Sequence, residues 1–142
     1  MSEVRKLIRY GIKSVLENLT QADDRVFVNR KIPLELEQIY PAILVYSGDE
    51  TASRITQFKN AYTRVYAVTV EVRLSHSAQE NDSVSIDDTM DDIAAEVEDG
   101  LRSFAMNAVK AVVYTGAEPT IDDDGDTIMG SIKLNYEFTY IL

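Results

Sequence analysis

Cysteine is missing from this chain of 142 residues, and histidine occurs only once, at His76. Without cysteine, neither disulfide bonds nor thiolate metal sites can support the fold. A single histidine does not provide the ligands of a conventional zinc site, and no motif around it suggests a Ser-His-acid triad. We therefore expect His76 to lie at the surface or at a strand end, without a catalytic role.

Long apolar runs are missing as well. Residues 1–13 mix charges into an amphipathic pattern, whereas a secretion signal has an unbroken apolar core. Apolar stretches such as residues 42–46 are far shorter than the roughly 20 residues of a membrane-spanning helix. We therefore expect a protein that is neither exported nor inserted in a membrane, and that assembles in the cytoplasm.

Motifs of common enzyme chemistry are also lacking, since there is no glycine-rich phosphate loop, nucleophile elbow or dinucleotide fingerprint. Residues 121–126, IDDDGD, begin like a calcium loop. Aligning their glycine with the sixth position of an EF-hand places Thr120 first and Ser131 twelfth, where carboxylates are required. We interpret the segment as a turn. The alternative is weak cation binding by Asp122, Asp123, Asp124 and Asp126. The sequence predicts no metal, no cofactor and no enzymatic activity.

Positive charge is scarce, and its distribution is uneven. The net charge is −10, which argues against a nucleic-acid binder because phosphate neutralisation needs a surplus of Lys and Arg. Residues 1–76 hold 11 Lys and Arg against 9 Asp and Glu, a balance of +2, whereas residues 77–142 hold 3 against 15, a balance of −12. This pattern indicates either an acidic surface that serves solubility or opposite charges that favour head-to-tail contacts between copies.

Two segments have the apolar spacing of three and four that is typical of amphipathic helices, residues 2–19 and residues 86–104. The second helix has an acidic outer face. Acids in the first turns of a helix interact favourably with its dipole, so much of this cluster needs no functional explanation. The four acids nearest the start are Asp87, Asp88, Asp91 and Asp92.

Five strands are predicted, at residues 26–30, 42–46, 66–75, 111–114 and 127–141, the fourth continuing irregularly toward residue 121. The last of these alternates most clearly. Asp124-Gly125 is the residue pair that a tight hairpin turn prefers. Residues 47–62 are polar and follow neither period, which indicates an extended hairpin or a mobile arm.

The order of elements is helix, strand, strand, long arm, strand, helix, strand, strand. It predicts a single domain over residues 1–142, with an extended arm at about residues 47–64. The fold class is α/β in the broad sense (α+β): two helices pack on one mixed or mostly antiparallel sheet of about five strands.

Three segments, in this order after an amphipathic helix, resemble one known family. They are YPAILVYSGDE at residues 40–50, YAVTVEVRL at residues 66–74 and IDDDGDTIMGSIKLNYEFTY at residues 121–140. They are similar to the minor tail protein U family of lambda-like siphophages, the tail terminators. The resemblance implies a small α/β subunit of the virion tail, at its head-proximal end. Such subunits form a hexameric ring, stop polymerisation of the tail tube and bind the head-completion protein.

The arm is our hypothesis for the subunit interface. Its basic residues Arg54, Lys59 and Arg64 would contact either the acidic surface of a neighbouring copy or the last ring of tube protein, and Gln57, Phe58 and Tyr62 would add contact area. The complementary acids would be Asp87, Asp88, Asp91 and Asp92. The alternative is a flexible, solvated loop.

Other functions remain open at this stage. Within phage assembly, the chain could be another neck component, such as a tail-completion or head-tail joining protein. Outside it, an acidic regulatory or ligand-binding domain fits the fold. A DNA mimic would explain the acidity but not the slightly basic first half.

Overall fold

The computed structural model describes residues 3–30, 40–55, 61–77, 85–123, 125 and 127–142. Its elements are α1 (Glu3–Leu16), β1 (Val26–Phe27), β2 (Ala42–Arg54), β3 (Tyr62–Ser77), α2 (Ile86–Arg102), β4 (Val109–Asp123) and β5 (Thr127–Ile141). The strands form one sheet in the order β1-β2-β3-β5-β4. The β1–β2 pair is parallel and the other pairs are antiparallel. The predicted fold class, two helices with a mixed sheet of five strands, is confirmed.

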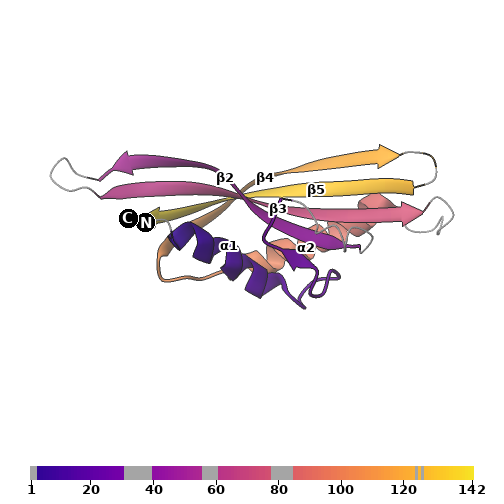
Figure 1. Cartoon of the computed structure of the whole chain (residues 1–142), viewed down its shortest axis with the longest axis horizontal. Helices are drawn as coiled ribbons and strands as arrows, with labels where there is room; N and C mark the ends of the chain where they lie inside the picture. Colours follow the sequence, from indigo (N-terminus) through magenta and orange to yellow (C-terminus); the bar gives the residue numbers. More distant parts are fainter. Residues whose placement is uncertain (1–2, 31–39, 56–60, 78–84, 124, 126) are drawn as a thin grey trace.

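Both helices pack on the same face of the sheet (Figure 1). They bury the apolar stripes that the sequence predicts, led by Ile8 and Ile12 on α1 and by Met90 and Ile93 on α2. The matching face of the sheet consists of alternate residues, such as Val70 on β3. Because each fully buried aliphatic side chain contributes about 1.5–3 kcal/mol, this layer dominates the stability of the fold.

Local signals explain where the helices begin and end. Ser85 caps α2, because its side chain accepts a 3.0 Å hydrogen bond from the backbone N–H of Asp88. The first helix stops at Leu16, three residues before the predicted end. Asn18 there adopts a positive φ of 62°, and its N–H donates to the carbonyl of Asp23. A left-handed residue of this kind ends a helix.

The predicted long arm is an extended hairpin in the residues that the structure describes. β2 continues through polar residues as far as Arg54 and pairs with β3 from Tyr62 onward, with a register shift between Ser47 and Glu50. Of the two alternatives predicted for residues 47–62, the described residues form the extended hairpin, and β2 continues beyond the strand predicted at residues 42–46. Cross-strand hydrogen bonds with β3 extend a segment whose side-chain pattern alone is not strand-like. Conversely, β1 covers only two of the five residues predicted at 26–30.

The last two strands form a second long hairpin. β5 has the bounds predicted for it, whereas β4 is longer than predicted and has register shifts on either side of residues 111–114. Pro119 is tolerated in β4 because this strand lies at an edge of the sheet. At the turn, Gly125 has a φ of +97° and its N–H donates to Asp123 Oδ1 over 2.8 Å. Asp124 and Asp126 lie outside the described residues.

The two hairpins lie at opposite ends of the long axis (Figure 1). The β2–β3 hairpin extends past the start of α1, and the β4–β5 hairpin lies above the first turns of α2. The molecule is therefore elongated along its strands, with a different hairpin at each end.

Candidate self-assembly surfaces

Among the residues that the structure describes, no group of three or more His, Asp or Glu side chains is placed to hold a metal ion. In the same part of the chain, the helices are too short or too polar to cross a bilayer. His76 lies near the end of β3, opposite Ile128. The candidate functional features of the described residues are two strand edges and the charged groups near them.

Two long strand edges are open. Within the described residues, β4 pairs with β5 on one side and with no strand on the other. The other edge strand, β1, covers β2 only at Ile43 and Leu44. From Glu50 to Arg54, β2 therefore pairs with β3 alone in the described part of the chain. Open edges expose unpaired backbone N–H and C=O groups, which can pair with a strand of another chain.

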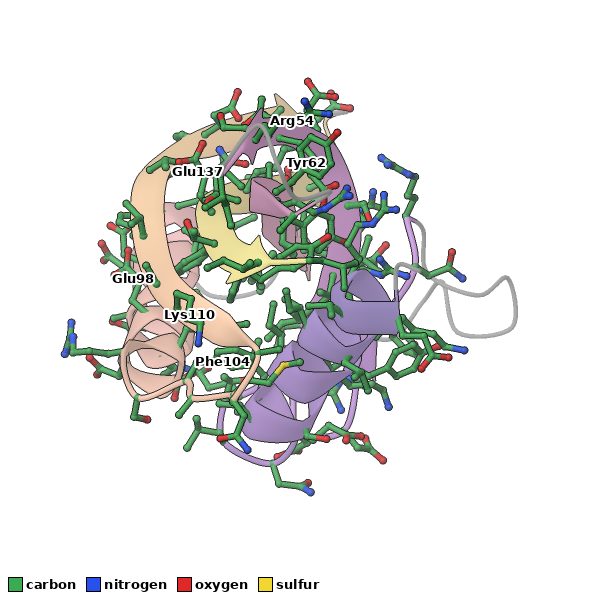
Figure 2. The ribbon with its side chains drawn as sticks, turned by 90° about the vertical axis from the view of Figure 1, so that its left-hand side faces the viewer. Arg54, Tyr62, Glu98, Phe104, Lys110 and Glu137 are labelled. Atoms are coloured by element: carbon green, nitrogen blue, oxygen red, sulfur yellow. The ribbon has the colours of Figure 1, made fainter. Side chains whose placement is uncertain are left out.

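The basic residues predicted at the hairpin differ in whether their charge is paired within the subunit. Arg64 points toward the helix side, where its Nη1 lies 3.1 Å from Glu50 Oε2. Arg54 is exposed, and its guanidinium lies 6.0 Å from the ring centroid of Tyr62. Figure 2 looks onto this end of the molecule and shows Arg54 and Tyr62 close together. The charge of Arg64 is thus paired within the subunit, whereas Arg54 is available to a partner. Gln57, Phe58 and Lys59 lie outside the described residues.

The four predicted acids all lie on the solvent side of the first turns of α2 and are exposed: Asp87, Asp88, Asp91 and Asp92. None of them forms an ion pair with the described residues. They sit at the end of the long axis opposite to the β2–β3 hairpin (Figure 1). The structure therefore does not bring the predicted basic and acidic groups together within one subunit.

Sequence reasoning missed a polar layer beneath α1. Glu50 accepts a 2.6 Å hydrogen bond from the hydroxyl of Tyr140, and Arg5 Nε lies 3.7 Å from the same carboxylate oxygen. One helical turn further along, Arg9 Nη1 donates to the hydroxyl of Tyr66 over 2.7 Å. The signal that could have found this layer is the spacing of four between the two arginines, together with tyrosines at core positions of their strands. Burial and then the bond to Glu50 raise the pKa of Tyr140 to about 12.

The opposite face of the sheet carries its own polar network. Glu71 is only 4% exposed, although it is charged. It accepts hydrogen bonds from the Tyr46 hydroxyl over 2.6 Å and from Arg73 Nε over 2.7 Å. Burial and then the bond to Glu71 raise the pKa of Tyr46 well above its ordinary value. These bonds satisfy a buried carboxylate, so the network is structural in character.

A shallow hollow of about 380 Å³ lies between the end of α2 and β4. Its walls include Glu98, Arg102 and the rings of Tyr114 and Tyr136, whose centroids are 5.2 Å apart. Burial and then Glu98 raise the pKa of Tyr114. Figure 2 shows Glu98 on this side of the molecule. The hollow is open, and its position beside β4 makes it part of the surface next to that strand edge.

Neither the protein-family models nor the curated proteins contain a match to this chain.

Proposed function

We propose that this chain is a structural subunit that assembles head to tail into a closed ring, and that the ring is the tail terminator of a long-tailed phage. The single observation that carries the assembly proposal is that, among the residues the structure describes, two different strand edges on opposite sides of one sheet have no strand paired with them. Contacts between unlike surfaces of identical copies generate closed rings or open filaments, depending on the rotation between neighbours.

An exposed strand edge invites uncontrolled pairing, so stable monomers normally block such edges with charges, prolines or bulges. Here such features flank the open stretches: β2 carries Glu50 and Arg54 around residues 51–53, and β4 has a register shift on each side of residues 111–114. Residues 51–53 and 111–114 themselves contain no charge and no proline. Pairing between copies would cover a stretch of each edge at once, and in a closed ring every copy would have both stretches paired. Open strand edges, which would promote aggregation of a monomer, would thus form the subunit contacts of the ring.

The assignment to the phage tail rests on the three segments that resemble the tail terminators. It proposes a hexamer that caps the tail tube, ends tube polymerisation and offers a surface to the head-completion protein. The charge is compatible with this role, because each copy carries a net charge of −10. A strongly acidic channel would repel DNA phosphates and let the genome pass without adhering. We predict that no Lys or Arg cluster lines the channel.

Deleting the gene in its phage tests the function. Loss of a tail terminator should give overlong tubes in negative-stain images, and the gene supplied from a plasmid should restore the normal length. Tails of normal length that fail to join heads would instead assign the chain to a head-tail joining role. A chain that stays monomeric beside assembled tail tubes, with tails unaffected by its loss, would contradict the proposal altogether.

A further inference from the structure

Resting on the proposed function, we infer which edges close the ring. Residues 51–53 of β2 in one copy pair antiparallel with residues 111–114 of β4 in the next copy, so that the five-stranded sheets join into one continuous sheet. The occupant of each open edge is thus a second copy of this chain.

The first argument is that the two edges lie at the same level of the sheet. Thr51 pairs with Val65, Val65 pairs with Thr139, and Thr139 pairs with Ala111. This row crosses the whole sheet from one open edge to the other, at right angles to the strands. In a closed ring, neighbours are related by rotation without a shift along the axis, so contacting edges have to lie at one level. These two segments meet that condition.

The second argument concerns strand direction. β2 is antiparallel to β3, β3 to β5, and β5 to β4, so β2 and β4 run in opposite directions within one subunit. A rotation about an axis along the strands preserves these directions. The β4 edge of one copy therefore meets the β2 edge of the next in antiparallel orientation, which needs no further reorientation of either strand.

The third argument comes from how each edge is protected. The second half of β4 carries features that discourage pairing, namely Glu118, Pro119, Asp122 and Asp123. In the first half, Lys110 and the two register shifts lie at the borders of residues 111–114. Between these borders the strand is regular and exposes apolar side chains, since Val113 is 50% exposed and Tyr114 is 44% exposed. On β2, residues 51–53 are small and uncharged. The unprotected stretches of the two edges are the ones that lie at a common level.

The remaining part of the β2 edge cannot take part in the same way. At Ile43 and Leu44 it is covered by β1. The row through Ile43, Val72 and Ile132 reaches β4 at Pro119, in its protected half. Both edges are therefore closed at this second level, and the pairing is confined to the end of the sheet near the β2–β3 hairpin.

Because the native chain has no cysteine, introduced pairs can test the contact directly. Thr51 and Ala111 belong to the same row, and alternation along the strands places both on the sheet face away from the helices. Within one subunit, two strands lie between them, a separation of about 14 Å at the usual strand spacing. A disulfide needs Cα atoms within about 7 Å. A bond between these positions must therefore join two copies.

The experiment combines Thr51→Cys with Ala111→Cys and oxidises the assembled protein mildly. The expected result on a non-reducing gel is a ladder that ends at one largest species, because a closed ring has a fixed number of copies. The matched control combines Thr51→Cys with Thr120→Cys. Thr120 lies on β4 and on the same sheet face as Ala111, but in the protected half of the strand. This control should remain mostly monomeric. Two further pairs, Thr51→Cys with Val113→Cys and Ser53→Cys with Ala111→Cys, cover small shifts of register.

The outcomes separate the two claims. Rings that are visible by negative stain but not cross-linked by any of the three pairs overturn this interface and leave the proposed function standing. Cross-linking of the control pair to the same extent also overturns it. A protein that forms no rings, alone or with tail tubes, overturns the interface and the proposed function together. As a second variant, Val113→Lys should reduce ring formation at least tenfold, whereas Thr120→Lys should leave it unchanged.

Discussion

The hydroxyl of Tyr140, on the last strand, donates a 2.6 Å hydrogen bond to Glu50, ninety residues earlier in the chain. The same carboxylate lies 3.1 Å from Arg64 and 3.7 Å from Arg5. Glu50 thus connects β2, β3, β5 and α1 at the point where the β2–β3 hairpin leaves the helices. This contact holds the hairpin in one orientation, and so fixes the position of the strand edge that we assign to the neighbouring copy.

We predict that Glu50→Ala lowers the free energy of unfolding by about 2 kcal/mol, a typical loss for hydrogen bonds to a charged group. The substitution removes the acceptor of Tyr140 and leaves two arginines without a counter-charge. Urea unfolding of the monomer measures the change. Asp49→Asn is the matched control, because Asp49 is exposed and adjacent, and it should change stability by less than about 0.5 kcal/mol. Equal effects of the two variants would contradict the proposed role of Glu50.

Alkaline pH should destabilise the protein through its tyrosines. The pKa of Tyr140 is raised to about 12 in the folded state, against an ordinary value of 10.0. The folded state therefore holds this proton more tightly. The stability that results is fully present below pH 10 and is lost as the pH rises from 10 to 12. We expect the unfolding midpoint to fall over this interval.

The comparison variant for the alkaline transition is Tyr140→Phe. Its stability should be lower at pH 8 and should decline less steeply between pH 10 and 12. Ultraviolet absorbance of the phenolate gives an independent readout, since Tyr140 should lose its proton at a higher pH in the folded protein than in the unfolded chain. If Tyr140→Phe has the same pH profile as the wild type, the assignment of this titration to Tyr140 is wrong.

The salt dependence of assembly distinguishes strand pairing between copies from ion pairs between Arg54 and the acids of α2. If strand pairing carries the ring, raising the salt from about 0.05 M to 0.5 M should favour assembly, because it screens repulsion between copies of net charge −10. If Arg54 instead binds the acids of α2 in a neighbour, the same change should weaken assembly. Sedimentation at several protein concentrations measures the effect. We expect strengthening, and we expect Arg54→Glu to change ring formation by less than about threefold, within the range for exposed pairs.

Close packing between α2 and β5 gives a further prediction. A Cβ atom built on Gly130 would lie 2.9 Å from both Ile86 Cδ1 and Met90 Sδ. Gly130→Ala should therefore push the first turn of α2 away from the sheet and lower stability by about 1–3 kcal/mol. The control is Ser131→Ala, whose side chain points to the other face. Thermal unfolding that shows no difference between the two variants would contradict this packing.

How far the sequence alone predicts this fold depends on the element. β5 and α2 were predicted closely because their apolar side chains alternate with the period of the element, and burial on one face enforces that pattern. For the distal half of β2 the sequence left two alternatives, an extended hairpin or a mobile arm, because its polar residues form a strand by hydrogen bonding to β3 rather than by burying side chains. The length of β4 was underestimated for the same reason, because an exposed edge strand buries few side chains.

The candidate site shows the same division. The exposure of the four α2 acids and of Arg54 follows from their charge and could be predicted. The pairing of Arg64 with Glu50 could not, because it depends on the register shift in β2 that moves Glu50 to the helix side. The level at which the two open edges coincide is a property of strand registers across four strands. No local sequence pattern contains that information.

The placement of the hairpins at opposite ends of the long axis has one more consequence. In a ring whose strands run along its axis, every β2–β3 hairpin emerges on one rim and every β4–β5 hairpin on the other. The first rim presents Arg54, while the second presents Asp122 and Asp123 beside the acids of α2. Such a ring has two chemically distinct rims. One rim can bind the end of the tube in a fixed orientation, and the other then presents a different surface to the next protein that binds.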